Sequence, residues 1–362
     1  MNKAFLLIIL IVITCCSCRL PYNPDVEAGN KILVVDAFLT NHAGASYVRL
    51  YMAIPYDVSV TSPCVMNATV FLTDETNNII SFSETSPGYY EPVDTEFEGK
   101  IHVAYKLSVI TPDGSVYVSA PETIPEDIEP VNVYGGYTQT EYLIKGENGK
   151  TIRQTGKFCA LYFDYIGVDV VPRFRYTSSR LIEYGISISS CTFYCWKTVH
   201  DNNLRFTNEK FASSSINIHK QEVSISPYTN QILVRYIIDS PLGWIYSDSI
   251  IMVPEYRRIV TVDQYRLNDD SYAYYKSLIA QSEAEGKLFD PVISQLKGNI
   301  SCVNDPTQPV LGFFEASNLI TMTYDFRRYG VGSDIFVTRI DNLPPHSPEG
   351  FLFNHLPDFW IQ

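Results

Sequence analysis

The feature that most constrains the fold is a two-residue alternation of apolar and polar side chains, which recurs in short runs along most of the chain. One such run places Val48 and Leu50 on one face of an extended chain, and Tyr47, Arg49 and Tyr51 on the other. A period of two predicts a β-strand with one buried face. Because similar runs recur between Gly, Pro, Asn and Asp turn signals, the sequence predicts a mainly β protein.

Residues 31–120 are predicted to form a small domain of this type. The turn Pro112-Asp113-Gly114 joins two of its alternating runs into a hairpin. About seven short strands, spaced about 8–12 residues apart, favour an immunoglobulin-like or a transthyretin-like β-sandwich. Residues 121–131 contain three prolines and four acidic residues. They are expected to form a linker, because proline lacks a hydrogen-bond donor and acids are costly to bury in a central strand.

Residues 132–341 are predicted to form a larger β-rich domain with one helix. The helix is expected near residues 270–285, capped at its start by Asp270 or Ser271 and ended by Gly286. Its side chains at helical spacing are expected to pack in the core. This stripe consists of Tyr272, Tyr275, Leu278, Ile279 and Ser282.

The strands of the larger domain are expected over residues 158–166, 231–239, 244–253, 257–266, 310–314, 319–326 and 335–340. Residues 342–362 contain four prolines together with Phe351, Phe353, Phe359 and Trp360. This composition predicts an irregular tail that docks through its aromatic side chains.

The N-terminus has the pattern of a secretory signal. Lys3 precedes an apolar run at residues 4–13, which is too short to span a membrane comfortably. The segment closes on Ser17-Cys18, and a small residue directly before a cysteine is what lipoprotein signal peptidase requires. We expect residues 1–17 to be a signal peptide and Cys18 to carry fatty acyl chains, palmitate among them. An ordinary cleaved signal that happens to contain cysteines is the alternative.

Acyl chains at Cys18 would anchor the protein stably, since a three-chain modification exceeds the two signals that stable anchoring requires. Residues 18–30 include two prolines and show no periodicity, which is typical of an extended tether. The formal net charge of −13 disfavours a nucleic-acid binder, because phosphate binding favours a basic surface. The same charge is repelled by anionic headgroups, so the acyl chains are expected to make the contact with the bilayer.

Five cysteines remain after the lipidated position: Cys64, Cys159, Cys191, Cys195 and Cys302. An odd number leaves at least one free thiol. Cys191 and Cys195 are close together in a loop-like stretch and form a candidate disulfide. Plain buried thiols, or a metal or redox site, are the other interpretations. A zinc site would need two further ligands, which no neighbouring His or Cys pair supplies.

Three stretches of the chain resemble a known family: residues 33–41, residues 105–119, and residues 298–317 with Gly298-Asn299-Ile300 and Gly312-Phe313-Phe314. They resemble the family catalogued as domain of unknown function 4249, outer-membrane lipoproteins of Bacteroidota. The resemblance spans about residues 18–340. It implies an accessory role in nutrient capture beside a TonB-dependent transporter, and it carries no established catalytic residue.

Motifs for catalysis do not occur in the sequence. No two of the six histidines have helical i,i+3 or i,i+4 spacing, and there is no nucleophile elbow, P-loop or dinucleotide fingerprint. We therefore predict no enzyme activity, no cofactor and no metal site. Asp36 is unusual because it interrupts an apolar strand. A buried hydrogen-bonded acid, an edge-strand residue and a cation ligand are its three interpretations.

Aromatic side chains are the remaining candidates for binding. The chain has 26 tyrosines, and Tyr and Trp combine an apolar body with a polar tip that suits sugar stacking or a binding face. Tyr89, Tyr90, Trp196 and Trp244 are the candidate ligand contacts. Packing within the sheets is the alternative for each of them.

Together with the family resemblance, these features predict an acyl-anchored outer-membrane accessory lipoprotein. It would be a binding module that works with a TonB-dependent transporter in nutrient capture. The expected partners are the lipid bilayer, through the N-terminal acyl chains, and the transporter, with no nucleic acid. The periplasmic and the cell-surface face both remain open. The alternative is a structural or adhesive cell-surface protein, such as a fimbria-like component, and a glycan or peptide hydrolase is a third interpretation.

Overall fold

The computed structural model describes residues 32–53, 62–145, 151–166, 172–188, 191–201, 205–207, 217–227, 231–240, 243–284, 296, 298–328 and 335–339. The predicted signal peptide, the predicted acylation site Cys18, the predicted tether and the tail 342–362 lie outside these residues. Among the described helices, none has both the length and the apolar character needed to cross a membrane.

The described chain is mainly β, as the sequence predicts, and it contains a single helix, α2, Asp269–Ala284. Its strands are β1 Leu33–Thr40, β2 Tyr47–Met52, β3 Thr69–Asp74, β4 Ile79–Ser86, β5 Tyr89–Pro92, β6 Ala104–Ile110, β7 Val116–Ser119, β8 Glu122–Thr123, β9 Asn132–Lys145, β10 Thr151–Tyr165, β11 Phe174–Ile188, β12 Cys191–His200, β13 Arg205–Phe206, β14 Ile218–Pro227, β15 Gln231–Ser240, β16 Gly243–Arg266, β17 Ile300–Cys302, β18 Val310–Arg328 and β19 Ile335–Arg339.

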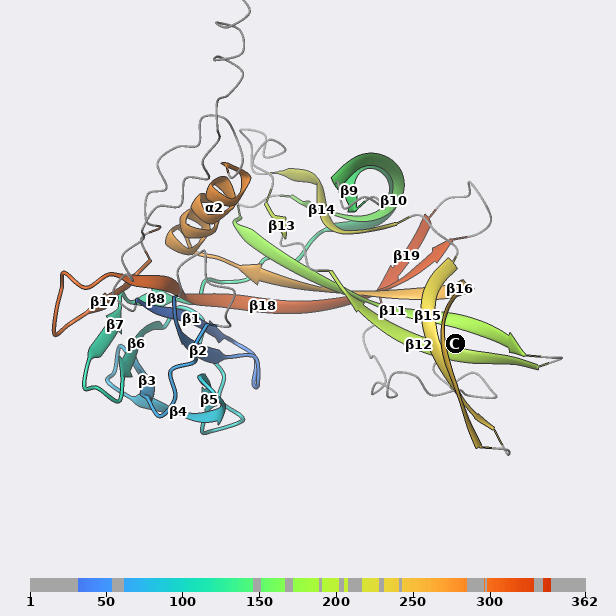
Figure 1. Ribbon diagram of the computed structural model, residues 1–362. Helices are drawn as coiled ribbons and strands as arrows, with labels where there is room; N and C mark the ends of the chain where they lie inside the picture. Colours follow the sequence, from blue (N-terminus) through green and yellow to red (C-terminus); the bar gives the residue numbers. More distant parts are fainter. Residues whose placement is uncertain are drawn as a thin grey trace, which may run out of the picture.

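One strand, β18, connects the two halves of the molecule (Figure 1). It pairs in parallel with β1 over residues 310–317 and antiparallel with β16 over residues 318–326. Twelve strands of a 16-stranded sheet therefore run in the order β12-β11-β16-β18-β1-β2-β5-β4-β3-β6-β7-β17. The other four lie off this path: β13 pairs with β11, β15 with β16, β19 with β18 and β8 with β6. A second, 3-stranded sheet has the order β14-β10-β9. The predicted strands 310–314 and 319–326 are thus one continuous strand, as are 244–253 and 257–266 within β16.

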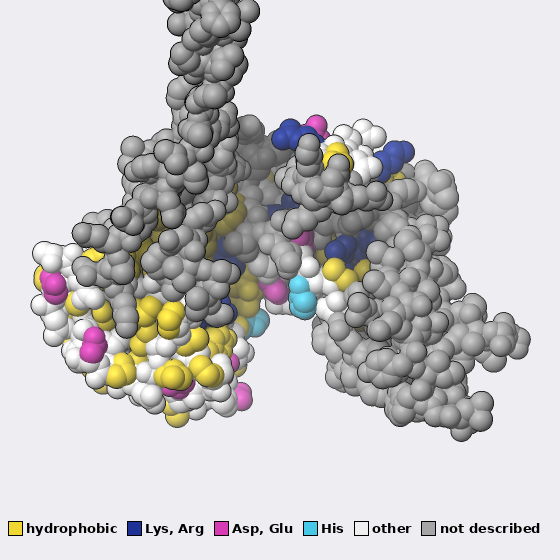
Figure 2. Space-filling view, in the orientation of Figure 1, with side chains coloured by type: hydrophobic (Ala, Val, Ile, Leu, Met, Phe, Trp, Pro, Cys, Tyr) yellow, Lys and Arg dark blue, Asp and Glu magenta, His cyan; other side chains and the backbone are white. Residues whose placement is uncertain are grey.

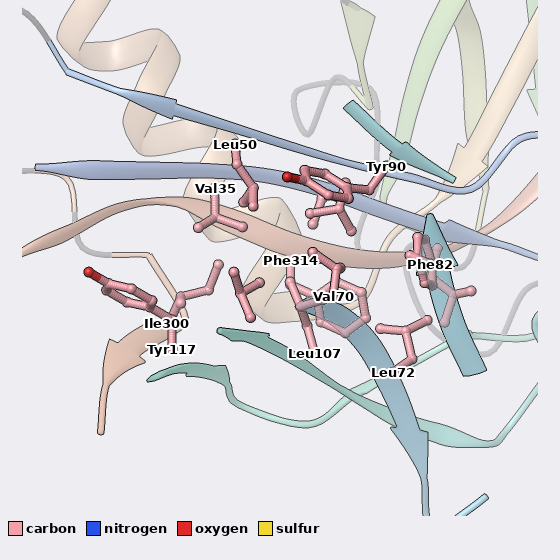
Figure 3. Close-up of a cluster of buried hydrophobic side chains, with 14 of the residues drawn as sticks. Val35, Leu50, Val70, Leu72, Phe82, Tyr90, Leu107, Tyr117, Ile300 and Phe314 are labelled. Atoms are coloured by element: carbon pink, nitrogen blue, oxygen red, sulfur yellow. The ribbon is translucent and has the colours of Figure 1, made fainter. Parts of the chain in front are cut away.

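The first core is enclosed by β1, β2 and β18 on one side and β3, β6 and β7 on the other (Figure 3). Val35 and Leu50 are fully buried and face Leu72 and Leu107. Each such side chain stabilises the fold by about 1.5–3 kcal/mol on burial. Ile300, Cys302, Phe314 and Ala316 belong to the same cluster. The core that forms around residues 31–120 is therefore completed by two strands from the end of the chain, which local periodicity could not indicate.

The junction of these late strands with β1 is unusually tight. Gly312 has φ +95, and a Cβ atom there would lie 1.9 Å from the carbonyl oxygen of Val35. A Cβ on Gly298 would lie 1.7 Å from the carbonyl oxygen of Gly312. Between them, the Asn299 side chain accepts a hydrogen bond from the Phe314 backbone N–H at 2.9 Å and donates one to the Phe314 carbonyl at 2.8 Å. This amide takes the place of a strand pairing and closes the first core.

The second core lies between the 3-stranded sheet and strands β11, β16 and β18 of the large sheet. It is rich in aromatic residues, and Tyr165 donates a hydrogen bond to Gln264 Oε1 at 2.5 Å while its hydroxyl contacts that of Tyr176 at 2.9 Å. The main members of this cluster are Leu161, Phe163, Tyr165, Phe174, Tyr176, Val223, Val260, Val262, Met322, Tyr324 and Phe326.

The predicted linker 121–131 is part of the packed structure. Its residues Glu122 and Thr123 form β8, which pairs with β6, and Ile124 is fully buried in the first core. The helix begins one residue earlier than expected, because Asn268 Oδ1 accepts the Ser271 N–H at 2.8 Å and so acts as the cap in place of Asp270 or Ser271. Two members of the predicted helical core stripe are solvent-exposed: Leu278 at 41% and Ile279 at 36%.

A buried acidic side chain, Glu183, lies on β11 of the large sheet. Glu183 on β11 is 5% exposed and lies opposite Arg257 on β16. Burial raises the pKa of Glu183 to about 7, although the positive charge of Arg257 lowers it. The Arg257 guanidinium also donates to both carboxylate oxygens of Asp325, at 3.1 and 2.7 Å. Two carboxyl groups therefore share one arginine.

We predict that Gly312→Ala lowers the free energy of unfolding by about 3 kcal/mol or more, because the new methyl group meets backbone and not a flexible side chain. Gly114→Ala is the matched control: its φ is +85, but nothing lies within 4 Å of the added Cβ. It should lose only about 1 kcal/mol, from the backbone conformation alone. Urea denaturation measures both, and equal losses would rule out the close approach to Val35.

We predict that Glu183→Gln stabilises the protein above neutral pH. The pKa of the folded state lies above the ordinary value of 4.5, so stability falls as the pH rises from about 4.5 to about 7. The variant should therefore exceed the wild type by about 1–2 kcal/mol at pH 8 and approach it at pH 5. Urea denaturation at the two pH values tests this. The exposed Glu141→Gln is the control, and a gain of the same size at both pH values would contradict the assignment.

Candidate functional site

Strands β1, β2 and β5 of the large sheet carry a group of aromatic and charged side chains on the side that faces away from the first core. The strand register aligns Phe38 with Tyr47, and Asp36 with Arg49 and then Tyr89, across β1, β2 and β5. These residues point away from the first core, because their neighbours along each strand are buried in it. We call this group the aromatic face; it consists of Asp36, Phe38, Tyr47, Arg49, Tyr51 and Tyr89.

Three rings of the aromatic face contact one another in a row along the sheet. Tyr47 and Tyr89 are stacked, with centroids 5.3 Å apart and an interplanar angle of 22°. Phe38 lies 5.1 Å from Tyr47 on the other side. The Arg49 guanidinium carbon is 6.0 Å from the centroids of both tyrosines, at the outer limit of a cation–π contact. The cross-strand neighbours thereby hold one another in place.

Asp36 and Arg49 form the polar centre of this face. The Asp36 Oδ2 and Arg49 Nη1 atoms are 3.9 Å apart, and the side chains are 35% and 54% exposed. Neither side chain has a hydrogen bond to another residue in the described part of the chain. Burial raises the pKa of Asp36, an effect that the charge of Arg49 opposes and that of Glu315 reinforces. The pair thus retains free donor and acceptor capacity at a surface lined by rings.

Helix α2 covers one border of the aromatic face (Figure 1). Tyr274 stacks on Phe313 of β18 with centroids 4.7 Å apart. Beside it, Arg175 of β11 forms a buried ion pair with Glu315 at 2.9 Å, and its guanidinium lies 3.9 Å from the Tyr265 ring. The stacking of Tyr274 on Phe313 and the buried Arg175–Glu315 ion pair therefore hold this border in place.

The start of α2 is tied to the same region. Glu122 of β8 accepts hydrogen bonds from the side-chain amides of Asn268 and Asn299, the latter at 2.8 Å. Asn268 caps the helix and Asn299 closes the first core, so a single carboxylate links the helix, β8 and the junction with β18. Burial raises the pKa of Glu122, while the two amides lower it.

The structure resolves the interpretations of Asp36. It is not on an edge strand, since β1 lies between β18 and β2. It is a half-buried acid, but its partner is Arg49 and not a hydrogen-bonding neighbour. No group of three or more His, Cys, Asp or Glu side chains that could hold a metal ion occurs in the described ranges.

The four aromatic residues predicted to contact a ligand do not gather at one place. Tyr89 belongs to the aromatic face. Tyr90 is 1% exposed, and its hydroxyl donates to the Val65 carbonyl at 2.9 Å and accepts from the Ala68 N–H at 3.0 Å. This corrects the prediction for Tyr90, which is a core residue. Trp196 and Trp244 lie on β12 and β16, opposite Glu183 and Asp239, and their side chains are outside the description.

The two cysteines of the candidate disulfide do not lie in a loop-like stretch as predicted. Cys191 and Cys195 lie in the extended strand β12, and not in a loop. A strand rises about 3.3 Å per residue, so their Cα atoms are about 13 Å apart, whereas a disulfide spans about 4.4–6.8 Å. A bridge between these two cysteines does not fit this strand. Of the other cysteines, Cys64 is exposed, whereas Cys159 and Cys302 are buried.

Sequence reasoning missed how the aromatic face is assembled. Alternation correctly placed Tyr47, Arg49 and Tyr51 on the face opposite the core. It could not show that Asp36 and Phe38 lie beside them, because that depends on the register between two strands. A charged residue that interrupts an apolar strand, as Asp36 does, was the available signal.

Exposed hydrophobic side chains are also visible on the unit formed by β1–β7 (Figure 2). Those of the largest exposure come from separate elements, which is the scattered exposure that globular proteins commonly show. The exposed hydrophobic side chains of this unit are Met66, Ile79, Val93, Ile101 and Ile110, and Val303, directly after β17, lies beside β7. The aromatic face differs because its rings surround a charged pair.

Comparison with known proteins identifies one family. The family model described as Domain of unknown function (DUF4249) matches residues 19–321. No curated protein and no solved structure matches the chain. The matched range contains the aromatic face, the tight junction at Gly298 and Gly312, and α2.

We predict that Arg49→Met raises the pKa of Asp36 further, because the opposing positive charge is removed while burial persists. Carboxyl-carbon NMR of selectively labelled protein measures this titration. Arg153→Met is the control, since Arg153 pairs with Glu141 at 3.2 Å on β9 and β10, away from Asp36. If the pKa of Asp36 is unchanged in Arg49→Met, the two groups do not interact as their geometry indicates.

Proposed function

The chain belongs to the DUF4249 family, and from this premise we propose that it is an acyl-anchored outer-membrane lipoprotein that binds ligand beside a TonB-dependent transporter. The observation that carries the proposal is Ser17-Cys18 at the end of a short apolar run, which suits lipoprotein processing. The family match begins at residue 19, directly after this cysteine.

The tether allows the body to work close to a membrane partner. From Cys18 to Ile32 there are fourteen residue steps, which can extend to at most about 48 Å. Two prolines within residues 19–30 favour an extended chain over a collapsed one. The body can therefore reach a transporter embedded in the same bilayer without penetrating the bilayer itself.

The aromatic face supports a binding role. Its rings and its Asp36–Arg49 pair are fixed by cross-strand packing, so little ordering cost would accompany binding. Preorganised sites of this kind combine apolar surface with a few placed polar groups. A capture protein needs such a surface, whereas an enzyme would need a nucleophile or an acid–base pair in addition.

A second candidate is a structural or adhesive surface protein. It is favoured by β12, which ends the order of the 16-stranded sheet in the described part of the chain. A strand at the end of a sheet can add a strand from another molecule. Recovery of the protein in shed polymer, and not with a transporter, would support this candidate.

We predict that Cys18→Ala abolishes acylation. Cells that produce the wild-type chain should incorporate an alkyne-tagged palmitate into the protein, and the variant should retain its leader and remain unlabelled. Cys16→Ala is the matched control and should be labelled normally. Mass spectrometry of the mature N-terminus reports the outcome, and an unmodified amino end in the wild type would refute the anchor.

Crosslinking of intact cells should recover a TonB-dependent transporter, and its absence would refute the partner.

A further inference from the structure

The aromatic face has a chemistry that selects a class of ligand, and this inference rests on the binding role proposed above. We propose that the aromatic face binds a neutral oligosaccharide. The sugar would stack on Tyr89, which Tyr47 supports from behind, and its hydroxyl groups would hydrogen-bond to Asp36 and Arg49.

Stacking is the first part of the argument. Tyr51 and Tyr89 are partly exposed on neighbouring strands. Tyr89 stacks on Tyr47 through one of its faces, and Tyr47 is held in turn by Phe38 on its other side. Tyr89 is therefore the ring at the end of this stack. A tyrosine ring offers an apolar face that matches the C–H face of a pyranose ring, together with a polar hydroxyl at its edge. Strands lie about 4.8 Å apart, so β1, β2 and β5 together span about 10 Å. This width suits a short oligosaccharide better than a single small ion.

Hydrogen bonding is the second part. The Asp36 carboxylate only accepts hydrogen bonds and the Arg49 guanidinium only donates them. Their 3.9 Å separation leaves both groups available to a ligand. Neighbouring sugar hydroxyls can donate to the carboxylate and accept from the guanidinium at the same time. An Asp–Arg pair is therefore complementary to a ligand that carries donors and acceptors side by side.

Charge then selects for a neutral ligand. The two groups cancel each other, so the face offers no net charge to an ion. The chain as a whole carries a formal charge of −13, which disfavours acidic ligands at long range. A cation would have to displace Arg49 from Asp36, and no second acid belongs to the aromatic face. A neutral sugar leaves the pair intact and adds hydrogen bonds to it.

The test uses the purified full-length lipoprotein in detergent. Isothermal titration calorimetry is carried out with hexasaccharides of α-glucan, β-glucan, β-mannan and β-xylan as neutral probes, and with hexagalacturonate as the acidic probe. Binding of at least one neutral hexasaccharide, with at least tenfold weaker binding of hexagalacturonate, is expected. Binding of none of the neutral probes, or preference for the acidic probe, would overturn the proposal.

Two variants locate the binding. Tyr89→Ala removes one stacking ring and Arg49→Met removes the donors while retaining an apolar side chain; each should weaken binding at least tenfold. Tyr134→Ala is the matched control, because Tyr134 is an exposed tyrosine on β9 of the 3-stranded sheet, with its hydroxyl 3.2 Å from Asp164. Circular dichroism and thermal unfolding verify that each variant is folded. Unchanged affinity in both Tyr89→Ala and Arg49→Met would place the sugar elsewhere and refute this site.

The result is independent of the anchoring proposal. A protein that binds the sugar but recovers no transporter on crosslinking retains the ligand assignment and loses the partner. A protein that recovers the transporter but binds no neutral probe retains the partner and loses the ligand assignment.

Discussion

The backbone ladder of β18 is the interaction on which the rest of the structure depends. One half of this strand pairs with β1 and the other half with β16, so a single extended segment belongs to both cores. Backbone hydrogen bonds that are buried must be satisfied, and here the same strand satisfies those of two otherwise separate regions. The regions around the first core and the second core are therefore connected by one continuous hydrogen-bonded strand, and not by a flexible linker (Figure 1).

The polar contacts around this strand are placed where its pairing changes from β1 to β16. Glu315 receives Arg175 from β11, Asn299 bonds the backbone of Phe314, and Glu122 joins Asn299 to the helix cap Asn268. Buried charges and amides of this kind are costly unless they are paired, and their pairing here specifies one arrangement of strand, helix and sheet. The aromatic face is one product of that arrangement, since α2 covers its border through Tyr274 and Phe313.

The sequence allowed the prediction of local structure more fully than of pairing. Alternation identified the strands around Val48 and Leu107 and placed Tyr47 and Arg49 away from the core, because side-chain period is a local property. It divided β18 at residues 315–318, three of which are polar or charged and look like a break when their partners are unknown. The approach of Gly312 to Val35 and the alignment of Asp36 with Arg49 depend on long-range register, which no single segment encodes. The family-like stretch 298–317 marked the tight junction without indicating its geometry.

The pairing of Leu33 with Val310 has a consequence for how the molecule is made. A chain that leaves the ribosome from its N-terminus exposes the apolar residues of β1–β7 long before β17 and β18 are made. Contacts between residues so far apart in the sequence slow folding and leave aggregation-prone intermediates. The first core is therefore complete only when nearly the whole polypeptide has emerged, because a chain that ends before residue 300 lacks the β17 and β18 side chains that belong to this core.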